Sequence, residues 1–349
     1  MASTMTPPFR GAEDFVIGLI GMGDMGKMIM ACDREEKYDE LVREFANHKN
    51  IQILRNGHLV SRASNYIIYS VEAAIIDRRV YLTAKEHDRI TADTQAVTHA
   101  AFLSMGKAWH ANAQFPWEGT RYVGGIENVK INLMLRIYAQ KWHVYAGLAI
   151  LNPEAHKQIN QFAKSTTELF YLMLEGRREE LRERVYRAKE KVLGEGGAKW
   201  AEKPLLPDGV VDRFSLNPAA KESGGPPMPN NHLSLLAMVD CWSALGIVPY
   251  DHMICSTPLF RLWLGVTEHL FRTPGLLDEC LRVGIEDNTF RRDDLQFTIA
   301  ASGWAECVAL RQFETWRERF AVTQKFFEPR FAESVEIGQA MIKAVLESG

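Results

Sequence analysis

The residues best suited to chemistry in this chain begin with a glycine-rich turn near its start. Gly21, Gly23 and Gly26 form a G-x-G-x-x-G pattern directly after the apolar run at residues 15–20. In such a pattern the first glycine permits a tight turn, the second lets the backbone approach a pyrophosphate, and the third lets a helix pack on a strand. Unpaired N–H groups at the start of that helix favour a phosphate's negative charge. The pattern predicts a dinucleotide-binding turn that includes Asp24 and Met25, and the alternative is a glycine turn without a ligand.

The acidic residue expected after this turn lies unusually close to it. A ribose-binding acid normally follows about 20 residues later, but Asp33 is only seven positions after Gly26. A helix of about ten residues and a return strand of about five do not fit into that interval. The neighbouring Arg34 could pair with a 2′-phosphate and so favours NADP. The sequence therefore predicts a nucleotide-binding domain that is incomplete.

Two further polar residues, His99 and Arg136, lie in stretches with the 3.6-residue period of helices. A planar guanidinium can hold a carboxylate through two parallel hydrogen bonds, and a histidine can donate to a second anionic group. Both residues are therefore candidates for binding an anionic substrate. The alternatives are a histidine satisfied within the core and an arginine in a surface ion pair.

The elements that must position these residues change in kind along the chain. Apolar runs at residues 15–20, 51–54, 66–71 and 80–83 predict strands. From residue 84 onward the pattern predicts helices, including 96–109, 129–145 and 152–193, and later 231–242, 259–271, 275–283, 293–313 and 315–327. Asn152 followed by Pro153 predicts a helix start, and Gly194 predicts a stop.

The expected fold class is α/β plus all-α, with a truncated Rossmann-like domain followed by a large helical domain in two lobes. We assign residues 1–83 to the incomplete dinucleotide-binding domain and 84–194 to a helical substrate and dimerisation domain. Residues 195–231, rich in glycine and proline, form a linker, and residues 232–349 form the second lobe. The sequence around His99 resembles that around His232, which suggests duplication. The chain is then either a homodimer or a monomer that imitates a dimer.

Composition excludes several other classes of protein. A formal net charge of −3 and a pI near 6.4 give no attraction for nucleic acid or for membrane surfaces. No segment has the roughly 18 uninterrupted apolar residues that cross a bilayer, and the N-terminus lacks the apolar stretch of a secretory signal. The 5 cysteines are scattered and contain no C-x-x-C pair, which predicts reduced thiols in the cytoplasm and no metal site.

Several long stretches resemble the fungal NADP-dependent prephenate dehydrogenases. The matching segments cover residues 21–26, 32–36, 56–62, 66–72, 86–88, 92–106, 141–149, 232–236, 249–260 and 325–329. Their number and spread along the chain favour this family over the related β-hydroxyacid dehydrogenases, which share a Rossmann domain followed by helices.

The resemblance implies an oxidoreductase of tyrosine biosynthesis that oxidises and decarboxylates prephenate to 4-hydroxyphenylpyruvate while NADP is reduced. By this resemblance His99 lies beside the substrate, and Arg136 and Gln95 bind it. The implied cofactor-binding residues are Gly21, Gly23, Asp24, Met25, Gly26, Asp33, Arg34, Ser70 and Val71.

One departure from the family concerns its catalytic histidine, which the second half of the nucleotide-binding sheet normally carries. No histidine occurs here between His58 and His87, and general acid–base help of this kind contributes roughly 10²- to 10⁴-fold in rate. Together with the short interval before Asp33, this departure indicates internal losses from the first domain. A non-catalytic remnant that retains the helical lobes for an interaction is therefore the alternative function.

Overall fold

The computed structural model describes Arg43, residues 83–119 and 124–194, Leu206, Phe214, and residues 230–252 and 258–347. The chain divides into two compact units, Met1–Arg89 and Ile90–Gly349. The predicted strands, apart from Thr83, and the predicted dinucleotide-binding turn lie outside the described residues. The fold of the second unit is described below.

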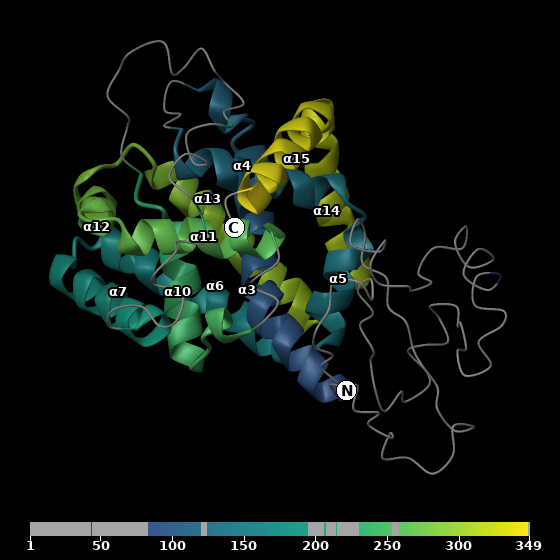
Figure 1. Cartoon of the computed structure of the whole chain (residues 1–349). Helices are drawn as coiled ribbons and strands as arrows, with labels where there is room; N and C mark the ends of the chain where they lie inside the picture. The colour runs from purple at the N-terminus through teal and green to yellow at the C-terminus, as the bar shows by residue number, and fades with distance from the viewer. Residues whose placement is uncertain are drawn as a thin grey trace. The chain divides into compact units, whose positions relative to one another are not determined.

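The described residues form helices joined by short turns, as the helical period after residue 84 predicts (Figure 1). The α-helices are α3 (Ala84–Ala111), α4 (Ile126–Ala139), α5 (Trp142–Leu151), α6 (Pro153–Leu174), α7 (Arg178–Leu193), α10 (Leu233–Leu245), α11 (Pro258–Arg272), α12 (Leu276–Glu286), α13 (Arg291–Ala309), α14 (Phe313–Phe327) and α15 (Phe331–Glu347). Short 3₁₀ turns are η3 (Pro116–Glu118), η4 (Pro249–Asp251) and η6 (Glu328–Arg330). The five helices predicted after the linker are confirmed as α10 to α14.

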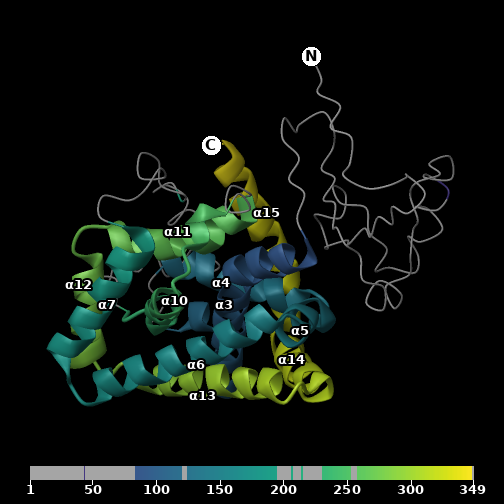
Figure 2. The same ribbon diagram turned by 90° about the horizontal axis from the view of Figure 1, so that it is seen from below.

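Helices from both sides of the predicted linker pack against each other. The long helices α6 and α13 lie side by side, with α7 and α12 near one end and α5 and α14 near the other (Figure 2). Helix α10 packs against α6 and α7, and α4 packs against α11 and α15. Leu206, from the predicted linker, is buried, and its side chain lies against Gly265 of α11. The second unit therefore has one continuous core.

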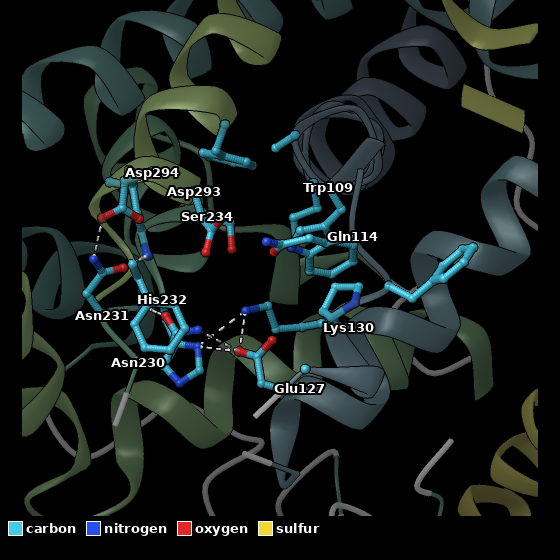
Figure 3. Close-up of a pocket in the computed structure, with 18 of the residues that line it drawn as sticks. Trp109, Gln114, Glu127, Lys130, Asn230, Asn231, His232, Ser234, Asp293 and Asp294 are labelled. Atoms are coloured by element: carbon cyan, nitrogen blue, oxygen red, sulfur yellow. Dashed lines mark hydrogen bonds and ion pairs between the residues drawn. The ribbon is translucent and has the colours of Figure 1, made fainter. Parts of the chain in front are cut away.

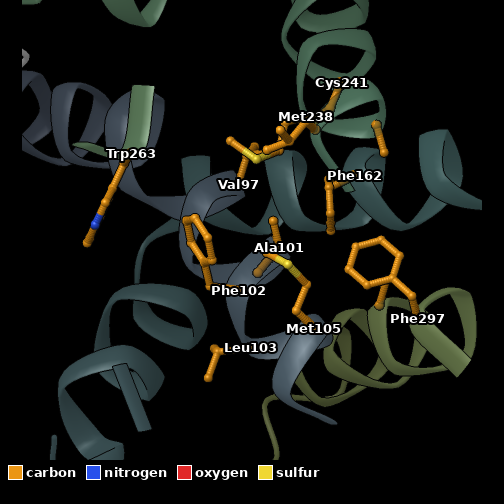
Figure 4. Packing of buried hydrophobic residues seen from close by; sticks show 14 of the residues in the cluster. Val97, Ala101, Phe102, Leu103, Met105, Phe162, Met238, Cys241, Trp263 and Phe297 are labelled. Atoms are coloured by element: carbon orange, nitrogen blue, oxygen red, sulfur yellow. The ribbon is translucent and has the colours of Figure 1, made fainter. Parts of the chain in front are cut away.

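Helix α3 runs through the middle of this core. Its residues 92–106 are all buried, as expected for a helix that is surrounded by others rather than exposed along one face. Val97, Ala101, Phe102 and Met105 are among its apolar side chains in the core (Figure 4). Any polar side chain on this part of α3 therefore lies away from bulk water.

The start of α3 and the two ends predicted around α6 and α7 follow directly from local sequence. Thr83 and Glu86 form a capping box, since the Glu86 carboxylate accepts from the Thr83 N–H at 2.8 Å and the Thr83 hydroxyl accepts from the Glu86 N–H at 3.2 Å. Asn152 caps α6 by accepting from the N–H of Glu154 at 2.9 Å, with Pro153 in the first turn. Gly194 ends α7 with φ of 74°. Both predicted boundaries are confirmed.

Two of the predicted helices are each divided in two, so those predictions were wrong in length. Residues 129–145 break between α4 and α5, where Gln140 and Lys141 are extended. The amide of Gln324 donates to the carbonyls of Tyr138 and Gln140 at 2.6 and 3.1 Å, and so satisfies the end of α4. Residues 152–193 break at Gly176, whose φ of 66° suits a residue without a Cβ.

No helix among the described residues is long and apolar enough to cross a membrane.

Candidate active site

His99 lies in an aromatic enclosure built by three helices. Its ring meets Tyr145 of α5 edge to face, with centroids 4.9 Å apart, and Trp263 of α11 with centroids 5.0 Å apart. The residue is 8% exposed. Aromatic edges and faces of this kind hold a ring in one orientation, so His99 is rigidly positioned.

The His99 imidazole is neutral across the physiological range. Burial lowers its pKa to about 3, because an imidazolium would lose its hydration in this apolar enclosure. Its Nδ1 atom is buried and has no hydrogen-bond partner among the described residues. A buried polar atom of this kind costs about 1–3 kcal/mol when left unsatisfied, so a ligand that reached it would recover that energy. His99 can therefore donate or accept a hydrogen bond but cannot serve as a cation.

Tyr145 links His99 to Arg136. Tyr145 is 7% exposed, and burial raises the pKa of its hydroxyl, while the charge of Arg136 opposes that rise. Arg136 is in the last turn of α4 and is partly buried. The structure thus brings His99 and Arg136 into one neighbourhood through Tyr145. Sequence reasoning missed Tyr145 and Trp263 as parts of this site, although Tyr145 lies within a stretch that matches the resemblance.

Gln95 lies one helical turn before His99, on the same side of α3, and is also buried. The neighbouring Asp93 fixes this end of the helix. Its carboxylate accepts from the Gln158 amide of α6 at 2.7 Å and lies 3.3 Å from the His252 ring. These contacts hold Gln95 and His99 on a helix whose orientation is constrained from two directions.

The residues predicted to bind the cofactor, from Gly21 to Val71, lie outside the described residues. Among the residues that the structure describes, no group of three or more metal-ligating side chains lies close together. The helical unit by itself therefore offers hydrogen-bond donors and a guanidinium, the chemistry needed to hold an anionic substrate.

A separate cavity of about 440 Å³ lies beyond the C-terminal part of α3 (Figure 3). It is lined by the end of α3, the starts of α4 and α10, the η3 turn and the start of α13. Neither His99, Gln95 nor Arg136 lines it. Sequence reasoning did not identify this cavity.

Residues 96–347 match the family model for the 6-phosphogluconate dehydrogenase C-terminal domain. The helical unit is therefore a domain of this class. No solved structure gives a significant match to the chain.

Two curated fungal proteins are similar over nearly the whole chain. The probable prephenate dehydrogenase (NADP+) of Schizosaccharomyces pombe is 42% identical, over 96% of this chain and 99% of its own length. The prephenate dehydrogenase (NADP+) of Saccharomyces cerevisiae is also 42% identical, over 95% of this chain and 94% of its own length. The chain belongs to this family of fungal prephenate dehydrogenases.

The two alignments are longer than the chain itself. Each covers 429 positions, whereas the chain has 349 residues, so at least 80 aligned positions have no residue here. This difference agrees with the internal losses expected from the short interval between Gly26 and Asp33.

Proposed function

We propose that this chain is an NADP-dependent prephenate dehydrogenase of tyrosine biosynthesis. The observation that carries the proposal is 42% identity to two proteins named for this activity, over 95–96% of this chain. The reaction is oxidative decarboxylation, in which prephenate loses carbon dioxide and becomes 4-hydroxyphenylpyruvate. The cofactor supplies the acceptor for the hydride, and the glycine-rich turn at residues 21–26 is the segment expected to hold it.

The helical unit contributes substrate binding to this reaction. Prephenate carries two carboxylates, and the Arg136 guanidinium is suited to hold one of them. The neutral His99, whose Nδ1 lacks a partner among the described residues, would donate a hydrogen bond to the substrate. Gln95, on the same side of α3, would supply further hydrogen bonds. Burial of these groups strengthens each of these interactions because the local dielectric constant is low.

The test is direct measurement of NADPH formation by the purified full chain with prephenate, together with calorimetric titration of NADP+. Binding of NADP+ and prephenate-dependent NADPH formation support the proposal. Because no histidine lies between His58 and His87, we expect turnover to be slower than that of the S. pombe relative by roughly 10²- to 10⁴-fold. Failure to bind NADP+ or to form NADPH would contradict the proposal in favour of a non-catalytic helical protein.

Replacement of Arg136 tests the substrate side. Arg136→Gln removes the charged partner of a carboxylate, and we expect kcat/KM for prephenate to fall by about tenfold or more. The matched control is Arg187→Gln, since Arg187 is exposed on α7 and pairs only locally with Glu183. The assignment of Arg136 fails if the two variants have equal kcat/KM.

A further inference from the structure

The cavity beside α3 has a strongly acidic wall at the start of α13. The carboxylate of Asp293 accepts from the Asn112 amide at 2.6 Å, and that of Asp294 accepts from the Asn231 amide at 2.7 Å. Both amides are neutral, so these hydrogen bonds orient the two carboxylates without cancelling their charge. Asp294 is 6% exposed. Two neighbouring carboxylates on the wall of one cavity favour a positively charged ligand.

The opposite wall is internally neutralised. Lys130 lies 2.6 Å from the Glu127 carboxylate, and His232 lies 3.0 Å from the same oxygen. Burial alone would raise the pKa of Glu127, but Lys130 and His232 outweigh it and hold this pKa at about 2. The positive charge of Lys130 is thus balanced by Glu127. What remains on the cavity surface is the negative charge of Asp293 and Asp294.

A further polar group and several aromatic side chains complete the cavity. Ser234 lines it and is 6% exposed, and no hydrogen-bond partner of its hydroxyl lies in the part of the chain that the structure describes. Figure 3 shows Ser234 beside Asp293, with Trp109 and Gln114 across the cavity. The apolar lining comes from Trp109, Phe115, Phe290 and Phe297. Aromatic faces attract cations as well as apolar groups.

We propose that this cavity is a second binding site, for a protonated primary amine carried on a small apolar or aromatic body. The ammonium group lies against Asp293 and Asp294 and donates to the Ser234 hydroxyl, and the apolar part lies against Trp109 and the phenylalanines. A volume of about 440 Å³ suits a small molecule. Prephenate is a dianion and would be repelled by the acidic wall, so the cavity is distinct from the proposed substrate site at His99 and Arg136.

The test compares three probes that share a phenyl ring and differ in the charge of the head group. Phenethylamine is a cation, phenethyl alcohol is neutral and hydrocinnamate is an anion. Each is titrated calorimetrically into the full chain. We expect phenethylamine to bind at least about tenfold more tightly than the other two, because a charge-assisted hydrogen bond contributes about 1.5–3 kcal/mol.

Variants of the acidic wall provide the second arm. Asp294→Asn and Asp293→Asn keep the shape of each side chain, and each is expected to weaken phenethylamine binding by about tenfold or more. Asp278→Asn is the matched control, because Asp278 is exposed on α12 and pairs with Arg182 away from the cavity. Circular dichroism verifies that each variant is folded.

Several results would overturn the proposal. These are no binding of phenethylamine, equal or tighter binding of the alcohol or the anion, and amine binding that both wall variants leave unchanged. None of these outcomes depends on NADP+ or on prephenate turnover, so the cavity proposal and the proposed function fail separately.

Discussion

The ring of His99 stands at 88° to the ring of Tyr145, with a centroid separation of 4.9 Å. This edge-to-face contact joins α3 to α5 and leaves the imidazole in an enclosure without a charged partner that would stabilise its protonated form. Burial is the only cause of its lowered pKa. The geometry therefore makes His99 a neutral hydrogen-bonding group at any pH where the protein would work.

This burial predicts a loss of stability in acid. The pKa of His99 is about 3 in the folded protein and 6.5 as a model value, so the unfolded chain binds a proton that the folded chain does not. The resulting stabilisation is complete above pH 6.5 and is lost as the pH falls toward 3. Relative to a His99→Leu variant, the wild type should lose on the order of 2–3 kcal/mol between pH 7 and pH 4.5. Urea unfolding of both proteins at each pH measures this difference, and a constant difference would show that His99 is hydrated.

Asp294 predicts a pH dependence of the opposite sign. Burial raises its pKa to about 7, although Asn231 and Arg291 oppose this rise. The folded state therefore keeps a proton that the unfolded state loses between pH 4 and 7, so the contribution of Asp294 to stability falls as the pH rises through that range. Asp294→Asn should match the wild type near pH 4 and exceed it by on the order of 2–4 kcal/mol at pH 8.

Thermal unfolding of the Asp294→Asn variant at the two pH values provides the measurement, and Asp278→Asn is the exposed control. A variant that is less stable than the wild type at pH 8 would contradict the buried, uncompensated carboxylate. A gain in stability together with a loss of amine binding would mean that the acidic wall is retained at a cost to folding.

The pair of Lys130 and Glu127 predicts a large effect of removing one partner. Both side chains are less than a tenth exposed, so Lys130→Met leaves a buried carboxylate without its cation. We expect a loss of about 3–5 kcal/mol in the free energy of unfolding. The matched control is Lys157→Met, whose partner Glu154 is at the same i−3 spacing but at the surface, and which should cost less than about 1 kcal/mol. Equal effects of the two changes would show that Glu127 is not isolated from water.

Two glycines within helices give a further paired prediction. A Cβ on Gly106 of α3 would lie 2.3 Å from the Tyr138 ring of α4, whereas a Cβ on Gly147 of α5 would meet nothing within 4 Å. Gly106→Ala should therefore destabilise the protein by about 1–3 kcal/mol through overpacking. Gly147→Ala should stabilise it by about 0.5–1 kcal/mol, because alanine favours a helix. Urea midpoints of the two variants check this, and the close packing of α3 on α4 is wrong if both changes stabilise.

Local chemistry made much of the helical unit predictable from sequence. Asn152 with Pro153 specified a helix start, Gly194 specified an end, and the apolar period specified α10 to α14, because caps and periodicity act over a few residues. The family followed from long matching stretches. The break between α4 and α5 could not be predicted in this way, because the amide that satisfies the end of α4 belongs to Gln324, far along the chain.

The sequence by itself determined the helical character, the family and the residue types available for chemistry, since these depend on local pattern and on consecutive identities. Only the tertiary structure decided which residues share an environment. Packing of α3 against α5 and α11 enclosed His99 and made it neutral, and packing of α13 near α3 and α10 placed Asp293 and Asp294 on a cavity wall. Dielectric environment and proximity arise from helices distant in sequence, and no local pattern encodes them.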